Sequence, residues 1–279
     1  MKKITSLLFL LSIILIITPS VFAQSNAAGS RGQSINGSTG LFSIPSGHIG
    51  WDSSKDFGFD IGYRAVINSD RGTAHLPAVT ISIFKIAEIS AAFDIQPQIF
   101  QQTNEDLLLG FKAKLPTKGS TAVAIGGNVQ LINLTNRDYN YNAYQPYAAV
   151  TYTGNIFNMA AETTIAVGKT FFTGGPVNIS NIDFGMGFDI ILFPDVFGNA
   201  VHWITDFANF GYSDNSWPND SLCHSASVWR GILNTGFRLD VSAIPALNQF
   251  KFLVDLIFND LFDAGTRSFT AGLVFGLEF

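Results

Sequence analysis

The sequence is poor in charge, cysteine and histidine, and each shortage excludes a class of protein. Charged residues make up 13% of the 279 positions, well below the roughly 25% of an average soluble domain. The single cysteine, Cys223, cannot form an internal disulfide. His224 follows it directly, but a second, spaced pair of zinc ligands is missing. We therefore expect no disulfide framework, no metal site and no cofactor.

Long apolar runs are also missing beyond the first residues. Two lysines precede an apolar run from Leu7 to Ile17, and Val21-Phe22-Ala23 offers small residues before a cleavage position at Gln24. This pattern predicts an exported protein whose signal peptide is residues 1–23. The run is shorter than the about 20 apolar residues of a membrane-spanning helix, and no later run reaches that length. No cysteine follows it, so a lipid-anchored lipoprotein is not expected.

The charge balance argues against one further class. Removing Lys2 and Lys3 from the 16 basic side chains leaves 14, against 21 acidic ones, so the exported chain has a net charge of −7. Nucleic-acid-binding proteins present a basic face to the phosphate backbone. We therefore expect no nucleic-acid partner.

Phenylalanine and period-two alternation are abundant instead. The chain has 26 Phe. In the last 13 residues apolar side chains occupy every second position, as in a strand with one apolar face. The same alternation, with an ambiguous phase in the ninth segment, predicts twelve strands: Asp56–Ile67, Ala78–Phe84, Glu88–Ile99, Asp106–Leu115, Thr121–Leu131, Tyr144–Tyr152, Met159–Val167, Ile182–Phe193, Val201–Phe210, Val228–Val241, Phe250–Asn259 and Arg267–Phe279.

These features together predict an all-β fold, a transmembrane antiparallel up-and-down β-barrel over residues 55–279 with twelve strands, or two more or fewer. In lipid only helices and closed barrels satisfy every backbone polar group, and strands of about ten residues suit a tilted span. A soluble sandwich would also alternate, but the long, Phe-rich apolar faces favour the barrel. Both termini should then lie in the periplasm, with long connections after the odd-numbered strands, apart from the short Gln101–Glu105, and short turns after the even-numbered ones.

The end of the chain resembles bacterial outer-membrane β-barrel proteins of the porin-like type. The resemblance rests on a final strand that closes with an aromatic residue, Phe279. It implies that Phe279 is part of the signal read by the barrel-assembly machinery. It also implies that the protein lies among the lipids of the outer membrane of a diderm bacterium.

Residues 24–54 do not follow the strand pattern. Gln24–Asn36 is rich in small polar residues and predicts a flexible tail. Gly37–Ser46 resembles the leading segment of barrels linked to exopolysaccharide export. We expect an ordered periplasmic strap in preference to a plug inside the lumen.

Polar side chains on the alternate face of the strands are predicted to line the lumen. Charge is costly in hydrocarbon, so charges gathered on one face indicate water or ion-pair partners there. Two hypotheses follow: an aqueous pore whose selectivity these charges set, or an ion-paired network that blocks the barrel. Interspersed Gly and Ala leave space and favour the pore. The candidate residues are Asp60, Arg64, Lys112, Lys114, Glu162, Asp183, Asp189, Arg230, Arg238, Asp240, Lys251 and Asp255, with Glu88, Asp94 and Glu278 on the same face.

The sequence therefore predicts passive diffusion of small hydrophilic solutes or ions through a narrow lumen, because twelve strands lie between a filled barrel and a wide channel. The alternative is a non-conducting barrel that acts in polysaccharide export or in adhesion through its loops. An enzyme is not expected. His224 has Ser221, Ser225 and Asp220 near it in the chain, but no nucleophile, base and orienting group form a recognisable motif.

Overall fold

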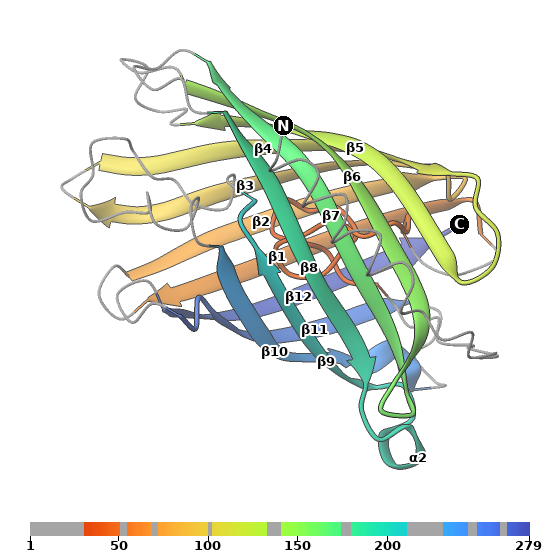
Figure 1. Cartoon of the computed structure of the whole chain (residues 1–279). Helices are drawn as coiled ribbons and strands as arrows, with labels where there is room; N and C mark the ends of the chain where they lie inside the picture. Colours follow the sequence, from red (N-terminus) through yellow and green to blue (C-terminus); the bar gives the residue numbers. More distant parts are fainter. Residues whose placement is uncertain are drawn as a thin grey trace.

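Twelve antiparallel strands close into one barrel, as predicted (Figure 1). The computed structural model describes residues 31–50, 55–68, 72–99, 102–132, 141–173, 180–210, 231–244, 250–262 and 267–279. Each strand pairs with its neighbours in sequence, and β1 pairs with β12 to complete the ring. The strands are β1 (Phe57–Asn68), β2 (Gly72–Ile83), β3 (Ala87–Ile99), β4 (Gln102–Leu115), β5 (Thr121–Ile132), β6 (Tyr141–Ile156), β7 (Met159–Thr173), β8 (Ser180–Ile191), β9 (Val201–Ala208), β10 (Ile232–Asp240), β11 (Lys251–Asn259) and β12 (Ser268–Glu278).

Two short helical segments lie in the turns that the structure describes. They are α2 (Pro194–Phe197), between β8 and β9, and a 3₁₀ turn (Val241–Ala243) after β10. Within the described part of the chain, no helix has the length and apolar character needed to cross a membrane.

The barrel wall is apolar outside and polar inside. On β1, Ile61 and Tyr63 are exposed on the outer surface, whereas Asp60 and Arg64 are buried inside. The same alternation continues around the ring and leaves large apolar side chains such as Phe111 and Phe275 exposed. This distribution reverses that of a soluble protein and is the one expected where lipid surrounds the wall.

Several strands extend further than the alternation indicated, at the end of the barrel away from the termini. β2 begins at Gly72 and contains Pro77, which the sequence reading placed in a loop. Proline lacks an N–H, and the β2–β3 ladder has no paired residues between His75 and Ala78. At this end of the barrel, residues 69–71 alone separate β1 from β2, and residues 100–101 alone separate β3 from β4. The expectation of a long connection is therefore wrong after β1, whereas the connection after β3 is short as expected.

The last residue participates in closing the barrel. The Phe279 N–H donates to the Phe57 carbonyl at 3.0 Å, and the Phe57 N–H donates to the Phe279 carbonyl at 3.1 Å. The two rings are stacked with centroids 6.1 Å apart. These contacts fix Phe279 at the β1–β12 seam, while its role as an assembly signal stays a prediction.

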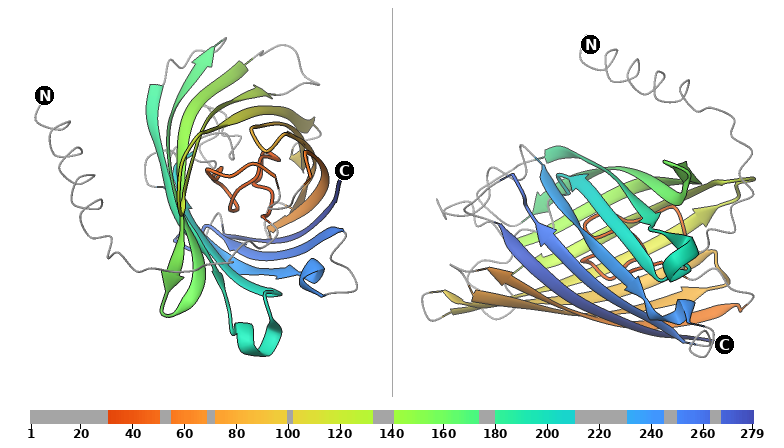
Figure 2. Two further views of the ribbon diagram at one scale, coloured as in Figure 1. Left: turned by 90° about the vertical axis from the view of Figure 1, so that its right-hand side faces the viewer. Right: turned by 90° about the horizontal axis from the view of Figure 1, so that it is seen from below.

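Residues 31–50 lie inside the barrel (Figure 2). We call this segment the plug. It folds back on itself, with bridges between Gln33 and Thr39 and between Gly40 and Pro45. The favoured expectation of a periplasmic strap is wrong for these residues, because they pack against side chains of the inner wall. The proposed signal peptide and residues 51–54 lie outside the described residues, so the predicted domain boundaries stay predictions.

Candidate functional site

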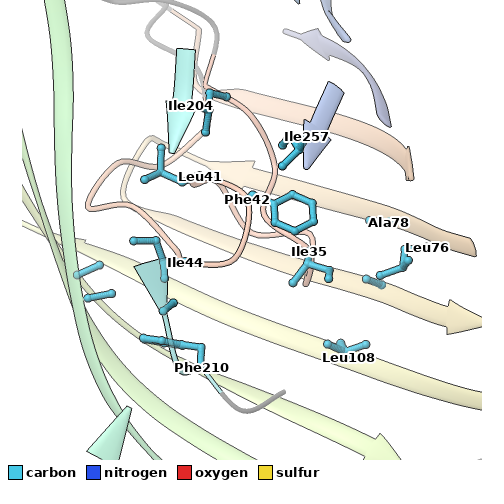
Figure 3. Close-up of a cluster of buried hydrophobic side chains, with 14 of the residues drawn as sticks. Ile35, Leu41, Phe42, Ile44, Leu76, Ala78, Leu108, Ile204, Phe210 and Ile257 are labelled. Atoms are coloured by element: carbon cyan, nitrogen blue, oxygen red, sulfur yellow. The ribbon is translucent and has the colours of Figure 1, made fainter. Parts of the chain in front are cut away.

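The plug carries an apolar cluster into the lumen. Ile35, Leu41, Phe42 and Ile44 are all buried, and they pack with apolar residues of the inner wall (Figure 3). The wall residues of this cluster come from strands all around the ring, among them Leu76, Leu108, Ile204, Phe210 and Ile257. The plug is therefore held by a small hydrophobic core of its own in the middle of a polar interior.

Glycines on the inner wall accommodate the plug. A Cβ atom on Gly185 of β8 would collide with the Ile44 side chain, and one on Gly187 would lie 2.6 Å from Leu41 Cδ1. On β1, a Cβ on Gly62 would collide with the Gln33 amide. The sequence reading took such glycines as a sign of open space. The structure shows that the plug fills this space.

Ion-paired side chains of the wall hold the plug backbone. Glu88 of β3 and Lys112 of β4 are opposite each other in register and form an ion pair of 3.0 Å. Glu88 Oε1 accepts the Thr39 N–H at 2.8 Å, and Lys112 Nζ donates to the Thr39 carbonyl at 2.7 Å. Arg64 acts similarly on β1, donating to the carbonyls of Gln33 and Ser34. One residue of the plug thus bridges both members of a buried ion pair.

Asp206 of β9 accepts three hydrogen bonds from the plug. Its Oδ2 accepts the N–H groups of Phe42 at 2.9 Å and Ser43 at 2.7 Å, and its Oδ1 accepts the Ser43 hydroxyl at 2.8 Å. Asn234 of β10, which is opposite Asp206 in register, donates to Oδ1 at 2.8 Å. The carboxylate therefore accepts the backbone N–H groups of the plug segment that places Phe42 in the apolar cluster.

Sequence reasoning missed Asp206 because it could not assign the phase of the ninth strand. The inner face of β9 holds His202 and Asp206 but also the apolar Ile204 and Ala208. A plug that packs on the wall requires apolar residues there, which removes the polar-inside signal. Asn234 on the neighbouring strand was predicted to face inward, and a buried amide there needs a polar partner, which was the available signal for Asp206.

Glycines of β12 let ion pairs form between strands that are not neighbours. Lys251 of β11 reaches across Gly276 to Asp60 of β1, at 2.8 Å. Arg64 of β1 reaches across Gly272 towards Asp255 of β11, at 3.7 Å. A side chain at position 272 would crowd both Arg64 and Asp255. Gly272 and Gly276 on the inner face of β12 thus leave room for acidic and basic side chains of β1 and β11 to meet.

Arg238 of β10 lies between Asp255 and a further acidic group, Asp189. It makes two contacts with Asp255, at 2.7 Å and 3.1 Å, and approaches Asp189 of β8 at 3.8 Å. His202 lies 2.6 Å from the same Asp189. The Arg238 guanidinium also lies against Gly32, where a side chain would collide with it.

Most of the predicted lumen residues therefore meet in pairs or on the plug. Arg31 of the plug donates to Glu162 at 3.0 Å, while Asp183 accepts from Thr170 at 2.5 Å and Gln145 at 3.0 Å. Asp240 accepts the Ser242 N–H at 2.9 Å, where the strand ends. Lys114 and Glu278 are partly buried, and Asp94 is buried. Arg230, like Ser221, Cys223, His224 and Ser225, lies outside the described residues.

The described residues contain no group of three or more His, Cys, Asp or Glu side chains placed to hold a metal. What they do contain is a lumen filled by a hydrogen-bonded segment and lined by paired charges. A segment in this position can block the lumen, and charged groups on the wall can discriminate between solutes by their charge.

Replacing Asp206 by alanine should loosen the plug. The N–H groups of Phe42 and Ser43 would lose a buried acceptor, at a cost of about 1–3 kcal/mol. A cysteine at Ser46, in a chain with Cys223→Ser, should then react with a water-soluble thiol reagent roughly 5–150 times faster. Asp206→Asn should give an intermediate rate, and an unchanged rate in Asp206→Ala would contradict the assigned contact.

Solved outer-membrane proteins share this architecture. The structure matches the NanC porin with a TM-score of 0.50 at 10% identity, over 80% of this chain and all of that one. It also matches the KdgM porin in complex with disordered oligogalacturonate (0.49, 9% identity, 79% and 99% of the two chains). A third match is the COG4313 outer-membrane channel from Pseudomonas putida F1 (0.44, 11%, 85% and 97%).

Sequence comparison adds nothing to this likeness, since no protein-family model and no curated protein matches the chain. At such low identity the structural matches speak for the fold alone. The protein has the closed, all-β barrel fold of porin-like outer-membrane proteins.

Proposed function

We propose that the protein is an outer-membrane barrel that lets small hydrophilic solutes or ions diffuse through its lumen, and that the plug closes this passage at rest. The observation that carries the proposal is the position of the plug inside a closed barrel with an apolar outer surface and a charged inner one. The predicted signal peptide supports export, and Phe279 supports insertion by the barrel-assembly machinery.

The plug can leave without opening the wall. The backbone ladders of the barrel run from strand to strand around the whole ring, and the bridges made by the plug lie within the plug itself. The wall therefore keeps its own backbone hydrogen bonds when the plug is absent, as a lipid-embedded barrel must. The contacts that would be lost include hydrogen bonds of wall side chains with the backbone and side chains of the plug, and the packing of its small apolar core.

A second candidate function is a barrel that never conducts and acts through its loops or partners. The observation that favours it is the ion pairing of the interior, since Arg238, Lys251 and Lys112 all have acidic wall partners. In that case the interior would serve only to stabilise the barrel.

Single-channel recording in a planar bilayer separates these functions. The mature full-length protein should be silent or open only in brief events, whereas a variant lacking residues 31–50 should give discrete, ohmic steps. Both proteins must first be shown to be folded and inserted, by their altered gel mobility before heating. A folded, inserted deletion variant that never conducts would overturn the proposed passage, and a steadily conducting wild type would overturn closure by the plug.

A further inference from the structure

We infer that the passage, when open, prefers cations to anions, an inference that rests on the proposed function. Three observations support it: the sign of the charges on the inner wall, their position along the barrel, and the hydrogen bonds that the plug makes with the wall. Each is a property of residues that the structure describes.

Carboxylates outnumber basic groups on the inner face of the described strands. The basic groups are Arg64, Lys112, Lys114, Arg238 and Lys251, whereas the carboxylates are Asp60, Glu88, Asp94, Asp106, Glu162, Asp183, Asp189, Asp206, Asp240, Asp255 and Glu278. An excess of one sign along a narrow lumen favours ions of the opposite sign.

The basic groups are also confined to one part of the barrel. Four of them lie in the halves of their strands nearest the chain termini, and Arg64 lies near the middle of β1. Toward the other end, the described inner wall carries carboxylates and amides without a lysine or arginine. Asp106 accepts there from Gln130 at 2.6 Å, and Asp183 accepts from Gln145. Along the described inner wall, a solute that moves inward from this end therefore passes carboxylates before any lysine or arginine.

The plug itself presents mainly N–H donors to these carboxylates. Glu88 accepts from Thr39, Asp206 accepts from Phe42 and Ser43, and Glu162 accepts from the Arg31 guanidinium. When the plug leaves, the carboxylates lose these donors. An ammonium or guanidinium group, or a hydrated metal cation, can replace them.

The basic wall groups that bind the plug are less available to an entering ion than the carboxylate of Asp206 once the plug has left. Arg64 keeps Asp255 on the wall, and Lys112 keeps Glu88. Among its contacts with described residues, Asp206 keeps only the amide of Asn234. Departure of the plug thus uncovers the carboxylate of Asp206 inside the lumen, while Arg64 and Lys112 keep acidic neighbours on the wall.

The test uses the full-length chain with Gly185→Leu, because a leucine at this position occupies the place of the Ile44 side chain. The zero-current potential is measured in a planar bilayer under a KCl gradient. We expect it to shift toward the equilibrium potential of K⁺. Asp106→Asn in the same chain should lower the K⁺/Cl⁻ permeability ratio roughly twofold, the effect of one charge several ångströms away in water.

Glu105→Gln is the matched control. Glu105 adjoins Asp106 on β4 but lies on the outer face of the strand, so removing its charge should leave the ratio unchanged. A zero-current potential at zero, or on the Cl⁻ side, would overturn the cation preference and leave the proposed passage intact. Folded, inserted barrels that stay silent with Gly185→Leu and also without residues 31–50 would overturn the passage, and the preference with it.

Discussion

Replacing Arg238 by methionine is expected to lower the free energy of unfolding of the barrel by about 3–5 kcal/mol. Arg238 is buried and holds Asp255 through two hydrogen bonds, at 2.7 Å and 3.1 Å. Without it, Asp255 keeps, among the basic groups of the described residues, the more distant Arg64 at 3.7 Å, and Asp189 loses one of its cationic neighbours. Methionine has a volume similar to that of arginine and should leave little cavity. The lower free energy of unfolding would therefore arise mainly from the buried charge left without its partner.

The measurement is urea-induced unfolding of the barrel in lipid vesicles, followed by tryptophan fluorescence. The double variant Arg238→Met, Asp255→Leu should recover only part of the loss, because it removes the unpaired Asp255 charge but also takes from buried Arg64 its acidic neighbour at 3.7 Å. Lys169→Met, on the exposed outer face of β7, should change little. A single Arg238→Met variant within about 1 kcal/mol of the wild type would show that this ion pair does not stabilise the fold.

Replacing Gly185 by leucine is expected to convert a closed barrel into a conducting one. The Ile44 side chain is fully buried and occupies the space that any side chain at position 185 would need. Interiors are close-packed, so a leucine there cannot be accommodated without displacing the plug from β8. The measurement is the fraction of time that single channels spend open in a planar bilayer.

Two further variants make this result specific. Gly127→Leu places the same side chain on the outer face of β5, where a Cβ has only ordinary contacts, and should leave the barrel closed. Adding Ile44→Ala to Gly185→Leu removes the colliding side chain and should restore part of the closure. If the Gly185→Leu variant conducts no more than the Gly127→Leu variant, the contact of Ile44 with Gly185 on β8 does not hold the plug in place.

The sequence was most informative about the faces of the strands. Ile61 and Tyr63 alternate with Asp60 and Arg64 on β1, because one face of the strand meets lipid and the other meets the interior. This alternation can be seen within the sequence of each strand taken alone. The ends of strands were less predictable. Pro77 reads as a loop residue, yet it lies within β2, where the ladder to β3 is interrupted beside it.

The pairing of charges could not be predicted in the same way. Lys251 and Asp60 are 191 residues apart in the chain and meet only because β12 lies between their strands and carries glycine at the crossing. Such a contact depends on closure of the ring and on the register of two ladders. Alternation along a single strand contains neither.

The location of residues 31–50 is the clearest case. Small and polar residues suit a tail, a strap or a plug equally well, because each of these needs turns and hydrogen-bonding groups. The sequence by itself determined a twelve-strand barrel with an apolar outside and a charged inside, since these follow from local alternation. Only the tertiary structure decided that the inside is occupied, because Glu88, Lys112 and Asp206 become ligands of the plug backbone once the wall has closed around it.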